Sequence, residues 1–426
     1  MPTPLQPRLS LRQALSDKRM TAILLLGFSS GLPLNLTGST LQAWMAHAGV
    51  DIKTIGLFGL VGFPYVLKFL WAPLLDRYLP PLLGRRRGWI LVYQLALAVG
   101  IAVMGLNSPT KAPYLLGLAA MAVAFLSASQ DIVIDAYRVD VIPPAERALA
   151  AAATAFGYRT AAMFAGTVIV LMAGHVGWRL AYFLVSAIMV AMILATLRAP
   201  EPLASGAQPK TLADAVLHPL QELLSRKGAW GFLLLVLFYK IGDAFALTLY
   251  SAFMIKGMGF SLDQLSLAGK LNMTVSTMLG TAIGGLFYMR WGLFRSLLIF
   301  GICQSFSNLM YMWLAIAGKH VWLLILATSV DTMIGGMGQA AFVAFIVCQC
   351  STNFSATQYA LLSALASVPR VFMGPIAGQL VAVIGWAHFF VVTFLCAMPG
   401  LILLVLLRKS IYGLEARDNV RTADAR

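Results

Sequence analysis

The sequence predicts an all-α membrane protein built from twelve transmembrane helices in two six-helix bundles. Hydrophobic residues make up 60% of its 426 residues and charged residues only 11%. A soluble globular protein carries roughly 25% charged residues, so a soluble fold is excluded. Twelve apolar stretches reach the length of about 20 residues that a helix needs to cross a bilayer. Short segments of the first half also recur in the second.

The spans divide six and six. Those of the first bundle are expected at about 20–46, 53–75, 88–107, 113–137, 148–174 and 177–198. Those of the second are expected at about 229–255, 262–289, 294–317, 321–349, 356–384 and 386–408. The chain is therefore divided into a first bundle over 1–198, a linker over 199–228, a second bundle over 229–409 and a tail over 410–426.

The linker carries its own signal. It begins with a stretch rich in Pro, Gly and Ser and continues with apolar residues at helical spacing: Leu212, Val216, Leu220 and Leu224. This spacing predicts a short amphipathic helix that lies on the membrane surface.

The basic residues predict the orientation. An even number of spans places both termini on one side, and the loops on that side carry 21 Lys and Arg against five on the other. The positive-inside rule therefore places both termini in the cytoplasm. The net charge of +15 does not indicate nucleic acid, because these residues lie in short loops between apolar spans.

Internal similarity supports two parallel repeats. Residues 43–45 (AWM) resemble 252–254 (AFM), and at an offset of 211 residues Arg159 falls on Arg370. Each similarity is short, but together with the six-plus-six layout they are typical of the major facilitator fold.

The expected cytoplasmic turn after the second span carries Asp76, Arg77, Arg85, Arg86 and Arg87. Its charges could pair with those of neighbouring helices in one conformation and separate in the other, forming a cytoplasmic latch. The alternative is that the arginines only fix the topology.

The stretch SASQDIVIDAYRVD (127–140) places acids in the fourth span. An ionised Asp at a bilayer centre costs about 2.5–3.5 kcal/mol, so such a residue usually faces a water-filled path or a partner. Asp131 is the candidate for proton coupling, with a permanent ion pair to Lys68 as the alternative. Asp135 and Asp140 lie nearer the cytoplasm and are expected to pair with the Arg85–Arg87 run.

The chain resembles the AmpG muropeptide permease family. The resemblance lies in GFSSGLPLNLTGSTLQAWM (27–45), KFLWAPLLDRY (68–78), PPLLGRRRGW (80–89), SASQDIVIDAYRVD (127–140), FYKIGDAFA (238–246), GGMGQAAFVAF (335–345) and FSATQYALLSALASVPRV (354–371). It implies a multi-pass protein of the bacterial inner membrane that imports anhydromuropeptides together with protons, for cell-wall recycling and β-lactamase induction. It also implies no cofactor, no metal and no nucleic-acid partner, and we expect a monomer.

In the facilitator fold the first, fourth, seventh and tenth spans line the central cavity. This places Asn35, Gln42, Lys240, Asp243 and Gln339 on lining helices. Lys240 and Asp243 lie three residues apart and could form a static pair. Alternatively, protonation of Asp243 releases Lys240 to an anionic cargo, which makes Asp243 a second proton-coupling candidate.

The other cargo-binding candidates are Gln130, Tyr158, Arg159, Asn272 and Arg370. An arginine inside a span keeps its charge and needs an anion or water, and its guanidinium binds a cargo carboxylate bidentately. The amides could bind sugar hydroxyls. Packing between helices is the alternative for each of these residues.

Three other functions remain possible from the residues alone. The layout also fits a facilitator for another anionic cargo, such as acyl-CoA, or a membrane receptor. A membrane-embedded transferase would need a nucleophile–base or metal constellation, and the sequence contains no HxxxxD, HExxH or P-loop motif.

Overall fold

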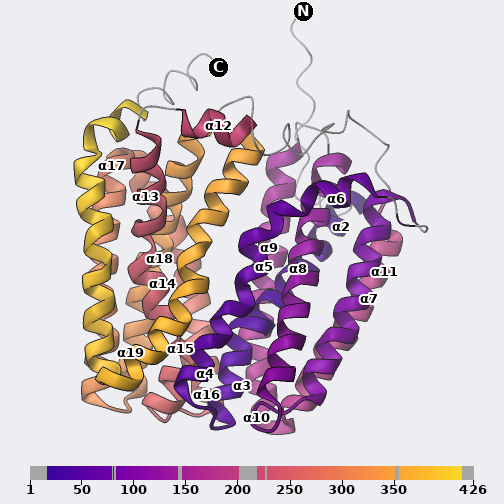
Figure 1. Ribbon diagram of the computed structural model, residues 1–426, viewed down its shortest axis with the longest axis horizontal. Helices are drawn as coiled ribbons and strands as arrows, with labels where there is room; N and C mark the ends of the chain where they lie inside the picture. Colours follow the sequence, from indigo (N-terminus) through magenta and orange to yellow (C-terminus); the bar gives the residue numbers. More distant parts are fainter. Residues whose placement is uncertain are drawn as a thin grey trace, which may run out of the picture.

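The computed structural model describes residues 17–78, 80, 83–142, 146–200, 218–225, 228–350 and 355–414. Backbone alone is described at 73, 76, 77, 147, 148, 218, 219 and 355–357. Over the described ranges the chain is helical and contains no strand (Figure 1). Ten helical segments in these ranges are long and apolar enough to cross a membrane.

The first half begins with a nearly continuous rod formed by α2 (Lys18–Asn35), η1 (Leu36–Thr40) and α3 (Leu41–His47). The second rod is made of short pieces, namely α4 (Ile52–Leu57), η2 (Phe58–Gly62), α5 (Phe63–Leu67), η3 (Lys68–Leu70) and α6 (Ala72–Arg77). The remaining helices are α7 (Arg85–Leu106), α8 (Pro113–Val141), α9 (Arg147–Met163) with η5 (Phe164–Val168) and α10 (Ile169–Val176), and α11 (Trp178–Arg198).

After α12 (His218–Leu224), the second half begins with a broken rod. It consists of α13 (Ala229–Tyr239), α14 (Ile241–Leu247), α15 (Tyr250–Ala252) and η7 (Phe253–Gly257). Then follow α16 (Leu262–Gln264), η8 (Leu265–Leu271), α17 (Asn272–Ala317), α18 (Val321–Cys348) and α19 (Ser355–Leu406).

Two of these helices are far longer than one membrane crossing. At 1.5 Å per residue, the 46 residues of α17 would extend about 70 Å if straight. Non-helical glycines interrupt both long helices: Gly292 in α17, with φ 76°, and Gly385 in α19, with φ 74°. Glycine adopts positive φ without Cβ strain, so the chain turns at these two points. They are the places where the sequence predicts a break between spans.

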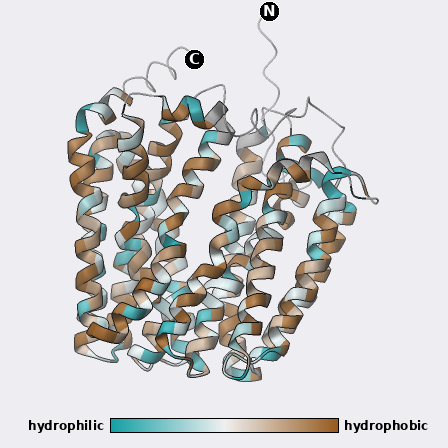
Figure 2. Cartoon of the chain, in the orientation of Figure 1, coloured by the Kyte–Doolittle hydropathy of each residue, from teal (hydrophilic) through white to brown (hydrophobic). Residues whose placement is uncertain are grey.

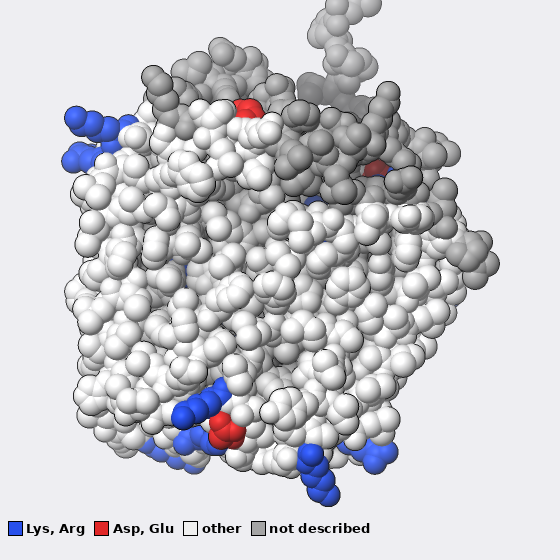
Figure 3. Space-filling view, in the orientation of Figure 1, with Lys and Arg blue, Asp and Glu red and all other residues white. Residues whose placement is uncertain are grey.

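The surface suits a lipid environment. Hydrophobic residues predominate along the outer helices (Figure 2). On the face shown in Figure 3, most charged side chains lie near the two ends, with an almost uncharged band between them.

Among the described residues, the hydrophobic core joins the two halves at one end. Around α3, α4, α10 and α16, a single buried cluster includes residues of both halves, such as Leu36, Ile169 and Phe253. Towards α6 and α12 the buried residues form two separate clusters, one in each half. We call the end of the molecule near α3, α4, α10 and α16 the α16 end, and the end near α6 and α12 the α12 end. The halves are therefore packed together at the α16 end.

Specific contacts reinforce this closure. Gln42 Nε2 donates to the carbonyl of Thr248 at 2.9 Å, and Ser251 Oγ donates to the carbonyl of Ser39 at 3.0 Å. Lys256 Nζ donates to the carbonyl of Val50. The first two bonds join the first rod of one half to the first rod of the other, and the third joins η7 to the loop after α3.

The described part of the linker helix, α12, packs against the second half. Leu212 and Val216 lie outside the described residues. Leu223 of α12 is buried in the core of the second half, and Gln358 Nε2 of α19 donates to the Glu222 carboxylate. α12 therefore packs on protein through one of its faces.

Candidate functional site

The first site is centred on Asp131 of α8. Ser30 of α2 donates its hydroxyl to Asp131 Oδ1, and Lys68 Nζ of η3 lies 3.7 Å from Oδ2. The Asp131 side chain is 12% exposed and that of Lys68 35%. Three rods of the first half therefore hold one carboxylate, and the ion pair with Lys68 is formed in this conformation.

Two tyrosines extend the site towards the second half. Tyr65 and Tyr158 lie close enough to Asp131 to interact with it electrostatically. Tyr158 is also within electrostatic reach of Arg370 on α19, which is exposed. The residue that follows, Val371, contacts Gly62 of the first half: a Cβ on Gly62 would lie 3.1 Å from its side chain. Tyr158 thus lies within electrostatic reach of a carboxylate of its own half and a guanidinium of the other.

Gln130, next to Asp131 in the chain, binds Ser29 and not the Asp131 site. It is fully buried, and its Nε2 donates to Ser29 Oγ at 2.8 Å. Gln94 Nε2 lies 3.2 Å from the same hydroxyl. In this conformation Gln130 binds helices together, which is the alternative that the sequence left open.

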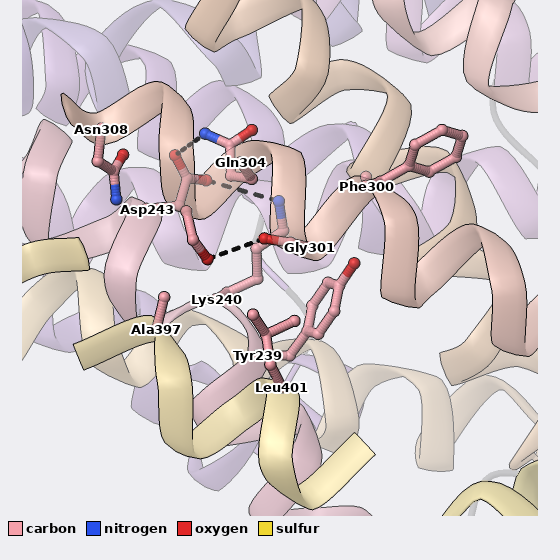
Figure 4. A pocket seen from close by; sticks show the side chains of 11 residues that line it. Tyr239, Lys240, Asp243, Phe300, Gly301, Gln304, Asn308, Ala397 and Leu401 are labelled. Carbon is pink, nitrogen blue, oxygen red and sulfur yellow. Dashed lines mark hydrogen bonds and ion pairs between the residues drawn. The ribbon is translucent and has the colours of Figure 1, made fainter. Parts of the chain in front are cut away.

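The second site lies at the break between α13 and α14. Lys240 has non-helical torsions (φ −101°, ψ 2°), and its Nζ lies 3.5 Å from Asp243 Oδ2 (Figure 4). Gln304 of α17 donates its Nε2 to Asp243 Oδ1 at 3.2 Å. Broken helices carry the binding sites of many secondary transporters, since the break frees backbone and side-chain groups inside the membrane.

Two ionisable residues inside the helices were missed from the sequence. Asp331 of α18 is fully buried, and Gln304 Nε2 donates to it at 2.8 Å. Lys270 of η8 is 7% exposed, and its Nζ lies 3.2 Å from the carbonyl oxygen of Ser39 in the first half. Both lie inside expected spans, so a complete inventory of intramembrane charges would have found them.

The remaining cargo candidates are dispersed. Asn35 Nδ2 donates to the carbonyl of Gly31 one turn earlier, and Gln42 takes part in the closure at the α16 end. Asn272 Nδ2 binds three oxygens of α18 and ties α17 to that helix. Arg159 and Gln339 are exposed. Among these candidates, Tyr158 lies within electrostatic reach of both Asp131 and Arg370, whereas the amides lie apart.

Three of the expected latch residues contact one another within the first half. Arg86 Nε of α7 donates to Asp140 Oδ2 at 2.7 Å, and an Arg85 nitrogen lies 3.9 Å from the same oxygen. Arg87 donates to the carbonyls of Thr196 at 3.0 Å and of the next residue at 2.6 Å, at the end of α11. Helix C-termini present free carbonyls, so Arg87 caps α11.

Asp135 departs from the expected pairing. Its carboxylate lies 3.2 Å from Arg138 on the same helix and is 57% exposed. Asp135 and Arg138 are three residues apart and share a helix face, so this local pair forms in place of one with the arginine run. The side chains of Asp76 and Arg77 lie outside the described residues.

Comparison with known proteins identifies the family of this chain. Residues 23–370 match the model of the Major Facilitator Superfamily. The chain is 46% identical over 402 residues to the anhydromuropeptide permease of Escherichia coli (strain K12), covering 94% of this chain and 82% of that protein. It is 30% identical over 405 residues to a Rickettsia felis transporter named AmpG 4, covering 93% and 98%.

The solved structures agree on the fold. A bacterial homologue of the human lysosomal transporter Spinster, in an inward-facing and unoccupied conformation, superposes with a TM-score of 0.73 at 15% identity. The match covers 95% of this chain and 99% of that one. On its sequence and its fold, the chain belongs to the Major Facilitator Superfamily and, within it, to the AmpG permease family.

Proposed function

We propose that this protein imports anhydromuropeptides across the bacterial inner membrane, coupled to protons, and thereby supplies cell-wall recycling and β-lactamase induction. The proposal of the cargo rests on the 46% identity to a permease named for it. Arg370 lies within electrostatic reach of Tyr158 and Lys68 lies beside Asp131, and a muropeptide presents carboxylates and a sugar face to such groups.

The proposed topology has twelve spans with both termini in the cytoplasm. Counting α17 and α19 as two spans each, divided at Gly292 and Gly385, converts ten apolar segments into twelve. The excess of Lys and Arg supports a cytoplasmic α12 end. The halves meet at the α16 end, so the conformation described is closed to the periplasm.

The observation that carries the coupling proposal is the contact of Asp131 with Lys68 and Ser30. A proton on Asp131 removes its charge and releases Lys68 to an anionic cargo. Departure of the cargo restores the pair and returns the proton on the cytoplasmic side. Each proton entering down a potential of 100 mV contributes about 2.3 kcal/mol. A tenfold accumulation of cargo costs about 1.4 kcal/mol, so one proton suffices for a cargo without net charge, and each net negative charge on the cargo requires one further proton.

Binding to the purified protein tests the cargo class. We expect an anhydromuropeptide to quench tryptophan fluorescence in a saturable way, and Arg370→Gln to weaken this binding by about tenfold, the equivalent of 1.4 kcal/mol. Acyl-CoA is the competitor to include. If acyl-CoA binds and the anhydromuropeptide does not, the proposed cargo is wrong and another anionic cargo replaces it.

A further inference from the structure

A second buried cluster of charges lies inside the second half, away from Asp131. It contains Lys240 and Asp243 at the helix break, Gln304 on α17 and Asp331 on α18. One amide nitrogen, Gln304 Nε2, donates to both carboxylates, at 3.2 Å to Asp243 and 2.8 Å to Asp331. The two acids therefore belong to one network.

The charges of this network do not balance. Lys240 contributes one positive charge, while ionised Asp243 and Asp331 contribute two negative charges. The other titratable groups that face the acids are Tyr239, Tyr250 and Tyr311, which are neutral. Among the described residues the cluster thus carries one excess negative charge at a fully buried carboxylate. An unpaired charge in such a place is strongly unfavourable, and one bound cation removes it.

The hydrogen bonds indicate that the cation is a proton. Ser307 Oγ lies 2.6 Å from Asp331 Oδ1 and 2.7 Å from the carbonyl oxygen of Gln304. A serine hydroxyl has one hydrogen, and here two acceptors compete for it. A proton on Asp331 provides the second hydrogen, so that Asp331 donates to Ser307 and Ser307 donates to the carbonyl. Gln304 Nε2 and Tyr311 Oη also lie within hydrogen-bonding distance of this carboxyl group.

A small cavity borders the cluster. Asp243, Gln304 and Asn308 line a cavity of about 20 Å³ (Figure 4). Asn308 is 1% exposed, and neither its amide nitrogen nor its oxygen has a partner in the described chain. A polar cavity of this volume holds about one water molecule, which would satisfy Asn308 beside Asp243.

We propose that Asp331, together with Asp243, forms a second proton-binding site in the second half of the molecule. Asp243 lies just after the break before α14, on the rod whose Thr248 and Ser251 bind the first half, and Asp331 lies on α18. When the site loses its proton, two carboxylates compete for Lys240 and Gln304. Because Lys240 lies at the helix break between α13 and α14, proton binding at the site is linked to the conformation of that break. This transport role rests on the proposed function, whereas proton binding itself needs no cargo.

Infrared difference spectroscopy on the full-length protein in lipid tests proton binding directly. Between acidic and alkaline buffer we expect a carbonyl band from a protonated carboxylic acid. Asp331→Asn and Asp243→Asn should each remove one component of this band. In either variant the single remaining carboxylate is balanced by the positive charge of Lys240, so it stays ionised and contributes no band. Lys240→Met should enlarge the band, since two acids then lack a cation.

The matched control is Asp51→Asn, an exposed helix cap where Asn serves equally well, and it should leave the band unchanged. If Asp331→Asn folds poorly, Asp331→Glu keeps a carboxylic acid at this position and should shift the band. Asp243→Asn then tests the same balance of two carboxylates against one lysine. A spectrum unchanged by both Asn variants would overturn the proposal. A band in the wild-type protein that disappears when sodium replaces potassium would assign the site to sodium and also overturn it.

Transport assays separate this site from the proposed function. We expect Asp331→Asn to lose gradient-driven accumulation of anhydromuropeptide and to keep exchange between equal cargo concentrations, which needs no net proton movement. Gradient-driven accumulation at the wild-type level in Asp331→Asn would remove the site from coupling. If the wild-type protein transports no muropeptide but its infrared band depends on Asp331, the cargo is wrong and the proton site stands.

Discussion

Gly56 of α4 and Gly374 of α19 pack backbone against backbone across the two halves. A Cβ on either residue would lie 2.5 Å from the carbonyl oxygen of the other. Gly378, one turn along α19, is similarly close to the carbonyl of Ile52, at 2.8 Å. Only glycine allows this approach, so the closed α16 end depends on these positions.

Gly374→Val should therefore force the halves apart at the α16 end, with a cost to the closed state of about 1–3 kcal/mol. Spin labels at His47 and Val383, both exposed near this end, should move to longer distances. The control is Gly285→Val, because a Cβ at Gly285 meets open space. An unchanged distance distribution in Gly374→Val would show that the glycine contact does not control closure.

Asp131→Asn should uncouple transport. Asparagine cannot carry the proton, so gradient-driven accumulation should fall towards equilibration, by about fiftyfold for one lost proton at 100 mV. Exchange between equal cargo concentrations should persist. The measurement is uptake as a function of external pH. The wild-type rate should rise as external pH falls, and the variant rate should rise less steeply.

The Asp51→Asn protein provides the reference, since it loses a carboxylate at an exposed cap and keeps the cap itself. If Asp131→Asn retains the wild-type pH dependence, Asp131 is not the coupling group, and the pair of Asp243 and Asp331 becomes the stronger candidate.

Lys270→Met should raise the thermal stability of the closed conformation. Among the described residues, Lys270 Nζ contacts only the carbonyl and hydroxyl oxygens of Ser39, at 3.2 and 3.4 Å. A buried ammonium without a carboxylate is unfavourable, and its removal should stabilise the fold by about 1–3 kcal/mol. Thermal unfolding followed by tryptophan fluorescence measures this change. A lower unfolding temperature would mean that the two hydrogen bonds outweigh the buried charge.

Asn272→Leu should lower stability and leave cargo affinity unchanged. Its amide joins α17 to Thr328 and Ser329 of α18, and interhelical hydrogen bonds of this kind contribute about 0.6–2 kcal/mol. The unfolding temperature and the muropeptide dissociation constant should be measured on the same preparation. Weaker binding at unchanged stability would instead return Asn272 to the cargo site.

The sequence predicts the positions of the long helices well because long apolar runs are a strong signal. The expected stretch 113–137 corresponds to α8, and the expected breaks in the second half fall at Gly292 and Gly385. It does not predict the broken backbone of the second rod or of α13–α14. Those interruptions depend on contacts with other helices, which hydropathy along one segment does not contain.

The candidate site was predicted only in part, for a related reason. Asp131 was identified because an acid within an apolar run has a cost that one segment reveals. Its partner Ser30 is an ordinary residue in sequence, and its position depends on the packing of α2 against α8. Gln130 and Asn272 show the converse, since polar residues that serve helix packing look the same in sequence as residues that bind cargo.

Uptake of labelled anhydromuropeptide into proteoliposomes, with an imposed proton gradient, tests the central claim most directly. We predict accumulation above equilibrium when the outside is acidic, its collapse on addition of a protonophore, and its loss in Asp131→Asn. Uptake that stops at equilibrium in the wild-type protein, with or without the gradient, would contradict proton-coupled import.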